Sequence, residues 1–145
     1  MGIRPFREND FTAVLDIYAK SKLDELTYER REFVLLPLDQ DQKRLAELHE
    51  SDIYVFEDNG VIGYGALFGS EIRALFVLPD CRGRGIGKLL LKHLLSCIEG
   101  PAVLYVAKSN APAKSLYETF GFKVGEEFET TYNCVSVLAN KMVRP

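Results

Sequence analysis

Val77-Leu78-Pro79-Asp80-Cys81-Arg82-Gly83-Arg84-Gly85-Ile86-Gly87-Lys88 is the stretch that decides how this chain folds. It follows an apolar run and opens an amphipathic pattern that is typical of a helix. Three alternating glycines between a strand and a helix let the backbone turn tightly, so that successive N–H groups point at one anion. Two arginines and a lysine in the same stretch add positive charge. We therefore expect this loop to bind a phosphate group.

Two common phosphate-binding loops do not fit the spacing. A P-loop has a glycine, four residues and then Gly-Lys-Ser/Thr, but here Leu89 follows Gly87-Lys88 and Arg82 stands in place of the first glycine. A dinucleotide-binding loop has the pattern G-x-G-x-x-G, and Lys88 stands where the third glycine belongs. Both alternatives are therefore disfavoured. A glycine-rich turn without any ligand is the remaining structural alternative.

The loop resembles the pyrophosphate-binding loop of the GNAT superfamily of N-acetyltransferases, which binds acetyl-CoA. The family pattern is Arg/Gln-x-x-Gly-x-Gly/Ala, and Arg82, Gly85 and Gly87 occupy its fixed positions. A longer form, V-x-P-x-x-R-G-x-G-I-G, is matched from Val77 to Gly87. A second family signature, N-x-x-A-x-x-L-Y-E-x-x-G-F, is matched at every fixed position from Asn110 to Phe122. Two motifs in the expected order make a chance similarity a poor explanation.

The resemblance implies that an amine attacks the thioester carbonyl of acetyl-CoA directly, in a ternary complex. Leu75 stands where the family places a backbone N–H that stabilises the oxyanion. Tyr117 matches the tyrosine that protonates the leaving thiolate, and a phenol with a pKa near 10 stays protonated at working pH. The placement of Glu71 resembles that of the glutamate base in histone-acetylating members, and a water relay is the alternative base.

The same resemblance assigns the contacts with the cofactor. The residues expected to bind acetyl-CoA are Leu75, Phe76, Val77, Arg82, Gly83, Arg84, Gly85, Ile86, Gly87, Lys88, Asn110 and Tyr117. Backbone N–H groups of the loop are expected to hold the pyrophosphate, while Arg84 occupies a variable position of the family. Asn110 is also expected to cap a helix. Purely structural roles are the alternatives: strand core for residues 75–77, ring packing for Tyr117 and a solvated charge for Glu71.

Length and composition predict a single domain over residues 1–145, because 145 residues suit one core. The formal net charge of −3 argues against nucleic acid as a partner. No apolar run approaches the roughly 20 residues that cross a bilayer, and the first residues lack a signal core, so we expect no membrane contact and a cytoplasmic location. Three cysteines without a C-x-x-C pair and two separated histidines predict no metal site.

Hydrophobic patterning predicts an α/β domain with a mixed sheet, and the resemblance implies the GNAT fold: a mostly antiparallel central sheet flanked by about four helices. The predicted strands cover 3–6, 53–56, 61–68, 71–77, 102–106, 122–124 and 132–142, the last two around a polar turn. The predicted helices begin at Asn9 or Asp10, at Asp41, after the glycine loop and at Asn110. The buried face of the third helix is expected to carry Ile86, Leu89, Leu90, Leu94, Cys97 and Ile98, and Cys134 is expected in the core.

The acceptor amine is the part of the function that these motifs leave open. The family selects it through segments that correspond to 21–52 and 126–140, where Tyr28, Phe33, Tyr132 and His49 are candidates. A small-molecule amine is favoured over a peptide or protein amine by analogy with the short chain. A non-catalytic acetyl-CoA-binding sensor or partner subunit is the alternative function. Homodimers are common among similar proteins, but no residue here predicts one.

Overall fold

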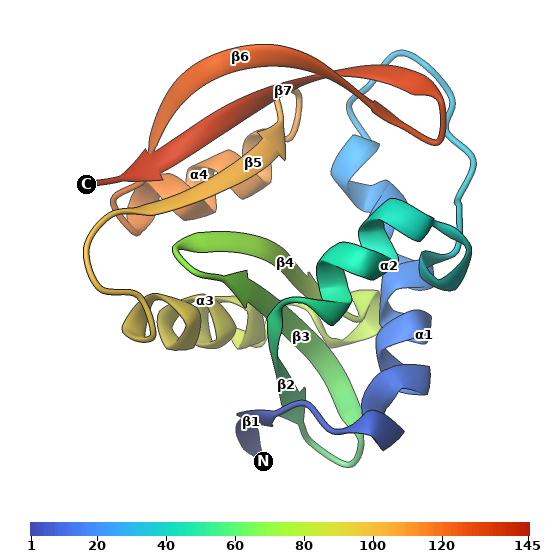
Figure 1. The fold of residues 1–145 in the computed structure, drawn as a ribbon, viewed down its shortest axis with the longest axis vertical. Coiled ribbons are helices and arrows are strands. Elements are labelled where there is room, and N and C mark those ends of the chain that lie inside the picture. The colour runs from blue at the N-terminus through green and yellow to red at the C-terminus, as the bar shows by residue number, and fades with distance from the viewer.

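A seven-stranded mixed sheet runs through the computed structural model, which describes residues 1–145 (Figure 1). Its order is β1-β2-β3-β4-β5-β7-β6, and all neighbouring strands are antiparallel except β4 and β5. The strands are β1 (Gly2–Pro5), β2 (Asp52–Glu57), β3 (Val61–Phe68), β4 (Glu71–Val77), β5 (Ala102–Ala107), β6 (Lys123–Tyr132) and β7 (Val135–Arg144). The mixed, mostly antiparallel sheet expected from the sequence is confirmed.

Four helices flank the sheet, as expected. They are α1 (Phe11–Ser21), α2 (Gln42–His49), α3 (Ile86–Ser96) and α4 (Ala111–Thr119). Side chains of α1 and α2 pack on β2, β3 and β4 in one apolar cluster. Side chains of α3 and α4 pack with β5 and β7 in another. None of the helices combines the length and the apolar character needed to cross a bilayer.

The C-terminal hairpin differs from the expectation. The sequence predicts a polar turn before residue 132, but β6 continues through this polar run to Tyr132. Because β6 is an edge strand with mostly exposed side chains, polar residues suit it. The turn lies instead at Asn133 and Cys134, with φ angles of 46° and 67°, as in two-residue hairpin turns. Cys134 is therefore exposed rather than part of the core.

The buried face of α3 also needs a correction. Ile86, Leu90, Leu91 and Leu94 are buried, but Leu89 is 47% exposed. At 100° per residue, Leu89 lies roughly 120° from the centre of that face. Cys97 follows the end of the helix and is exposed. The apolar spacing thus predicted the helix correctly and misplaced one edge of its buried face.

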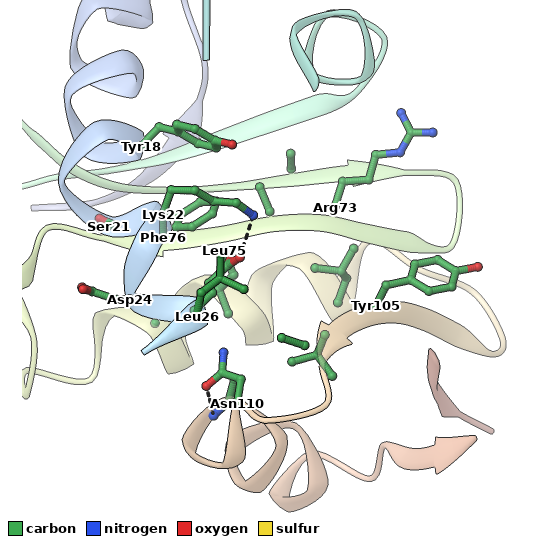
Figure 2. A pocket seen from close by; sticks show the side chains of 18 of the residues that line it. Tyr18, Ser21, Lys22, Asp24, Leu26, Arg73, Leu75, Phe76, Tyr105 and Asn110 are labelled. Atoms are coloured by element: carbon green, nitrogen blue, oxygen red, sulfur yellow. Dashed lines mark hydrogen bonds and ion pairs between the residues drawn. The ribbon is translucent and has the colours of Figure 1, made fainter. Parts of the chain in front are cut away.

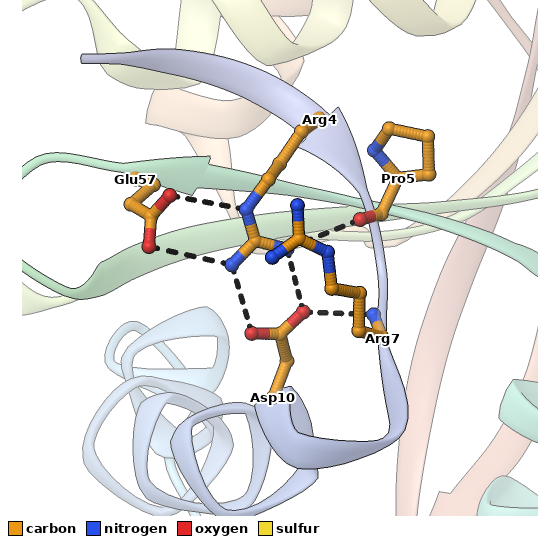
Figure 3. Close-up of polar contacts among 5 residues, drawn as sticks. All are labelled: Arg4, Pro5, Arg7, Asp10 and Glu57. Atoms are coloured by element: carbon orange, nitrogen blue, oxygen red, sulfur yellow. Dashed lines mark hydrogen bonds and ion pairs between the residues drawn. The ribbon is translucent and has the colours of Figure 1, made fainter.

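An ionic network holds the start of α1 against the first two strands (Figure 3). Arg4 binds the two carboxylate oxygens of Asp10 at 2.8 and 2.9 Å, and its Nε binds Glu57 at 3.1 Å. Asp10 also accepts the backbone N–H of Arg7 at 2.8 Å. The Asp10 side chain makes no capping hydrogen bond to α1 itself. Asp10 was expected to cap this helix, but its side chain instead stabilises the turn that precedes it. The hydrogen bonds from Arg4 lower the pKa of Asp10.

Two glycines of β3 let α3 lie close to the sheet. A Cβ at Gly65 would sit 2.9 Å from Cδ1 of Leu94, and a Cβ at Gly63 would sit 3.3 Å from Cδ1 of Leu90. Leu94 is fully buried, so its side chain has no free space to move into. This close contact fixes the position of α3, whose first turn carries the glycine loop.

Replacing Gly65→Ala is expected to lower the free energy of unfolding by about 1–3 kcal/mol, because the added methyl overpacks the core. Denaturant unfolding followed by circular dichroism measures this change. Gly87→Ala is the matched control, because its Cβ would meet only Cγ2 of Val77 at 3.9 Å and alanine favours a helix. Equal stability of wild type and Gly65→Ala would contradict the packing of α3 described above.

Candidate active site

Strands β4 and β5 separate in the middle of the sheet (Figure 1). They are in register only at Glu71↔Val103 and Ile72↔Leu104. On its other side, β5 pairs with β7 from Ala102 to Ala107. The rest of β4 therefore has no strand partner on the side that faces β5. This opening between two strands of one sheet is the origin of the site.

The backbone of β4 directs unused donors toward the opening. Arg73 is an extra residue in β4, because Ala66 pairs with Ala74 and Leu67 pairs with Ile72. Beyond this bulge, the N–H of Leu78 donates to the carbonyl of Ile62 at 2.9 Å. Alternate residues of an antiparallel strand bond to the same neighbour.

Because Leu78 bonds to β3, the backbone groups of Leu75 and Val77 point the other way, toward β5. A hydrogen bond agrees with this direction: Oγ of Ser21 donates to the carbonyl of Val77 at 3.3 Å. The N–H of Leu75 thus faces the open side of β4. This is the backbone group for which the family resemblance implies oxyanion binding.

A cleft of about 1140 Å³ occupies the opening (Figure 2). All the residues expected in the site line it, with one exception. The exception is Arg84, whose Nη2 binds Asp58 at 2.6 Å outside the cleft. Ile86 lines the cleft but its side chain is buried in the core, so only its backbone is available to a ligand.

The glycine loop presents unpaired N–H groups at one end of the cleft. Gly83 and Gly85 both have φ of 79°, a conformation that other residues adopt at a cost. The first helical bond of α3 runs from the N–H of Leu89 to the carbonyl of Gly85, at 3.0 Å. The N–H groups of residues 86–88 precede that bond and have no helical partner. Together with the positive end of the helix dipole they form an anion-binding site.

Arg82 links this loop to the segment that follows α1. Its Nη1 binds Oδ2 of Asp24 at 2.7 Å, and both side chains are about half exposed. Asp24 belongs to the 3₁₀ turn Lys22–Leu26, which lies on the other wall of the cleft. The positive charge of Arg82 thus stays beside the loop, and the ion pair joins two segments that line the cleft.

Tyr117 approaches the cleft from α4. Asn110 caps this helix as expected, since its side chain accepts the N–H of Ala113 at 3.4 Å. The Tyr117 ring packs edge-to-face against Phe122, with ring centroids 5.9 Å apart. Burial, and secondarily the charge of Glu25, raise the pKa of Tyr117 well above its ordinary value. The phenol therefore remains protonated over the neutral and mildly alkaline range and is available as a proton donor.

Two carboxylates lie on the acceptor side of the cleft. Glu71 stands at the start of β4, with Oε1 3.5 Å from Nε of Arg73. Glu25 binds Nζ of Lys22 at 2.6 Å. Sequence reasoning missed Glu25, because residues 21–40 show no helical or strand periodicity and the only signal there is a high density of charges.

The four acceptor candidates separate into two groups. Tyr28 and Tyr132 line the cleft. Phe33 packs against Tyr132 from behind, with centroids 6.4 Å apart. His49 stacks on Phe11 at 6.0 Å and lies in a separate shallow depression. His49 is therefore not part of this cleft.

A sheet opened between two parallel strands, with a glycine loop suited to an anion at one end and a partly buried tyrosine on the facing helix, is typical of acyl-CoA-binding folds. Residues 49–124, more than half of the chain, match the family model of the Acetyltransferase (GNAT) domain. The chain belongs to this family.

Known proteins similar to this chain agree with that assignment. The peptidyl-lysine N-acetyltransferase YjaB of Salmonella typhimurium is 38% identical over 72 residues, which cover 50% of this chain and 49% of YjaB. The match thus spans about half the length of that curated relative. A GCN5-related N-acetyltransferase structure from Rhodopseudomonas palustris aligns with a TM-score of 0.80 and 17% identity, over 98% of this chain and 93% of that one. The structure of yncA, a putative acetyltransferase from Salmonella typhimurium with acetyl-CoA, aligns with a TM-score of 0.72 and 21% identity, over 99% and 92%.

Replacing Gly85→Ala is expected to weaken acetyl-CoA binding on the order of tenfold or more, because a left-handed conformation costs an L-residue about 1–2 kcal/mol and the loop would relax away from it. Calorimetric titration with acetyl-CoA measures the loss. Gly87→Ala is the matched control, since the family pattern allows alanine there, and it is expected to bind like wild type. Wild-type affinity in Gly85→Ala would remove this loop from the binding site.

Proposed function

We propose that this protein transfers the acetyl group of acetyl-CoA to a primary amine by direct attack in a ternary complex. One observation supports this most: β4 leaves β5 after two residue pairs, so that the N–H of Leu75 is free beside the cleft. A hydrogen bond to the thioester carbonyl would become stronger as negative charge develops on its oxygen. Membership of the GNAT family and the phosphate-binding geometry of the loop support acetyl-CoA as the donor.

The chain's own groups provide the remaining steps. N–H groups of the glycine loop hold the pyrophosphate, and the pantetheine follows the open edge of β4 past Asn110. The amine nitrogen bonds to the carbonyl carbon, and the carbon–sulfur bond then breaks. Tyr117 gives its proton to the leaving thiolate. Glu71, directly or through a water relay, takes the proton that the amine must lose.

Replacing Tyr117→Phe is expected to lower kcat on the order of 100-fold, because the thiolate then leaves without its proton donor. Affinity for acetyl-CoA should stay near the wild-type value, since the ring and its packing on Phe122 are kept. Thiol release measures kcat, and calorimetry measures affinity. Because burial raises the Tyr117 pKa, the wild-type rate should show no alkaline loss from this group in the neutral range. Unchanged turnover would remove Tyr117 from the mechanism.

Replacing Glu71→Gln is expected to lower kcat on the order of 100-fold, because the amide cannot accept the proton that the amine loses. Thiol release measures kcat. Glu50→Gln is the matched control. Glu50 binds the same Arg73, at 2.5 Å, but lies outside the cleft, so its replacement should leave kcat unchanged. A wild-type kcat in Glu71→Gln would assign the base to the water relay.

A panel of amines tests the proposed function as a whole. Acceleration of thiol release by an amine, together with an acetylated product, is the expected result. A small-molecule amine is the proposed acceptor class, in preference to the peptidyl-lysine named for YjaB. Saturable acetyl-CoA binding without turnover on any amine would instead identify the protein as a non-catalytic sensor or partner subunit.

A further inference from the structure

We infer that the acceptor carries a carboxylate in addition to its amine, and that Tyr18 and Arg44 bind this carboxylate at the α1–α2 side of the cleft. The inference rests on the proposed function and names the substrate class of the same site: a small amino carboxylate.

The first observation is a buried hydroxyl without a partner. Tyr18 is only 3% exposed and lines the cleft, and its hydroxyl makes no hydrogen bond. In Figure 2 the ring extends from α1 beside Lys22 and Phe76, with the hydroxyl at its far end. Buried polar groups are almost always hydrogen-bonded in native proteins. An orphaned hydroxyl at a cleft wall is therefore best explained by a ligand.

The second observation is the arrangement of Arg44. Asp41 caps α2 by accepting the N–H of Arg44 at 3.2 Å, and its other oxygen lies 3.4 Å from Nε of the same arginine. This contact fixes the guanidinium over the Tyr132 ring, 5.5 Å from the centroid. The two terminal nitrogens make no hydrogen bond to the protein. They form the pair of parallel donors that a planar carboxylate accepts.

The two donors line the same cleft. The positive charge of Arg44 also acts on the Tyr18 hydroxyl, lowering its pKa, while burial raises it. The other charged groups that act on Tyr18 are Glu25 and Asp41, and Lys22 lies 5.9 Å from its ring centroid. Lys22 is paired with Glu25, and Asp41 is paired with Arg44.

Among the groups around Tyr18, those left without a partner are its own hydroxyl and the terminal N–H groups of Arg44. The charge of Arg44 and the O–H of Tyr18 favour an oxyanion over a second ammonium group at this wall. Polyamines and aminoglycoside-like amines therefore fit this wall poorly. An amino carboxylate would place its acid on Tyr18 and Arg44 and direct its amine toward β4.

Contacts above the cleft favour a small acceptor over a protein lysine. The Tyr132 hydroxyl accepts the N–H of Leu36 at 2.8 Å, and Nδ2 of Asn133 donates to the carbonyl of Val34 at 3.0 Å. The tip of the β6–β7 hairpin is thus joined to residues 34–36, and Arg44 lies against it from α2. These contacts join three segments beside Tyr132, which lines the cleft, and so limit the room for a large acceptor there.

The test compares amino acids with their own amides in the thiol-release assay, with each rate expressed per free-base amine, because loss of the carboxylate also lowers the pKa of the amine. We expect kcat/KM to be about 10- to 100-fold higher for the acids, the range of a charge-assisted hydrogen bond. Arg44→Gln and Tyr18→Phe should each reduce this preference by raising KM for the acid, with the amide unaffected. Lys20→Gln controls for lost positive charge, since Lys20 is exposed and paired with Asp16 on α1.

Folding gives a second, independent readout. Tyr18→Phe removes the orphaned hydroxyl and keeps the ring, so the ligand-free variant should be at least as stable as wild type. Equal kcat/KM for acids and amides, a preference that survives in Arg44→Gln, or faster turnover of a lysine peptide would each overturn the inference. Turnover only of amines that lack a carboxylate would overturn the inference and leave the proposed function intact. Absence of turnover with every amine would overturn the proposed function and this inference with it.

Discussion

The separation of β4 from β5 is the constraint on which the rest of this site depends. Two residue pairs join the strands, and beyond them the sheet opens. In a continuous sheet, these backbone groups of β4 would pair with β5. Where the sheet is open they need other partners, because buried N–H and carbonyl groups are almost always hydrogen-bonded. Ser21 satisfies the Val77 carbonyl, while the Leu75 N–H faces the cleft in which we propose that the thioester binds. The cleft and the exposed edge of β4 both follow from this opening.

The segment after α1 connects the two ends of the cleft. Asp24 binds Arg82 beside the glycine loop, and Glu25, the next residue, binds Lys22 on the opposite wall. One short turn thus contacts both the glycine loop and the wall where we propose that the acceptor binds. At the start of α1, ion pairs among Arg4, Asp10 and Glu57 hold the helix against the sheet. These ion pairs fix the position of the segment that follows α1.

The donor half of the site could be predicted from sequence because short motifs encode it. The glycine loop, the Asn110 cap and the Tyr117 position all follow from local patterns, and each lies where those patterns require. The acceptor half could not, because Tyr18 and Arg44 come together only through the packing of α1 and α2. The hairpin turn at Asn133 was missed because β6 is a polar edge strand. Its residues do not alternate between apolar and polar, so the sequence does not indicate a strand there. Leu89 was wrongly placed on the buried face of α3, because an apolar residue next to that face can be either buried or exposed.

Strand separation is expected to free the Leu75 N–H for the thioester carbonyl. The most direct measurement is an NMR titration that follows backbone amides during addition of acetyl-CoA and, separately, of CoA. Both ligands should shift the amides of residues 83–88, and acetyl-CoA alone should produce the larger downfield shift of Leu75 that a new hydrogen bond causes. A Leu75 amide that responds equally to both ligands, or to neither, would show that this N–H does not bind the thioester carbonyl.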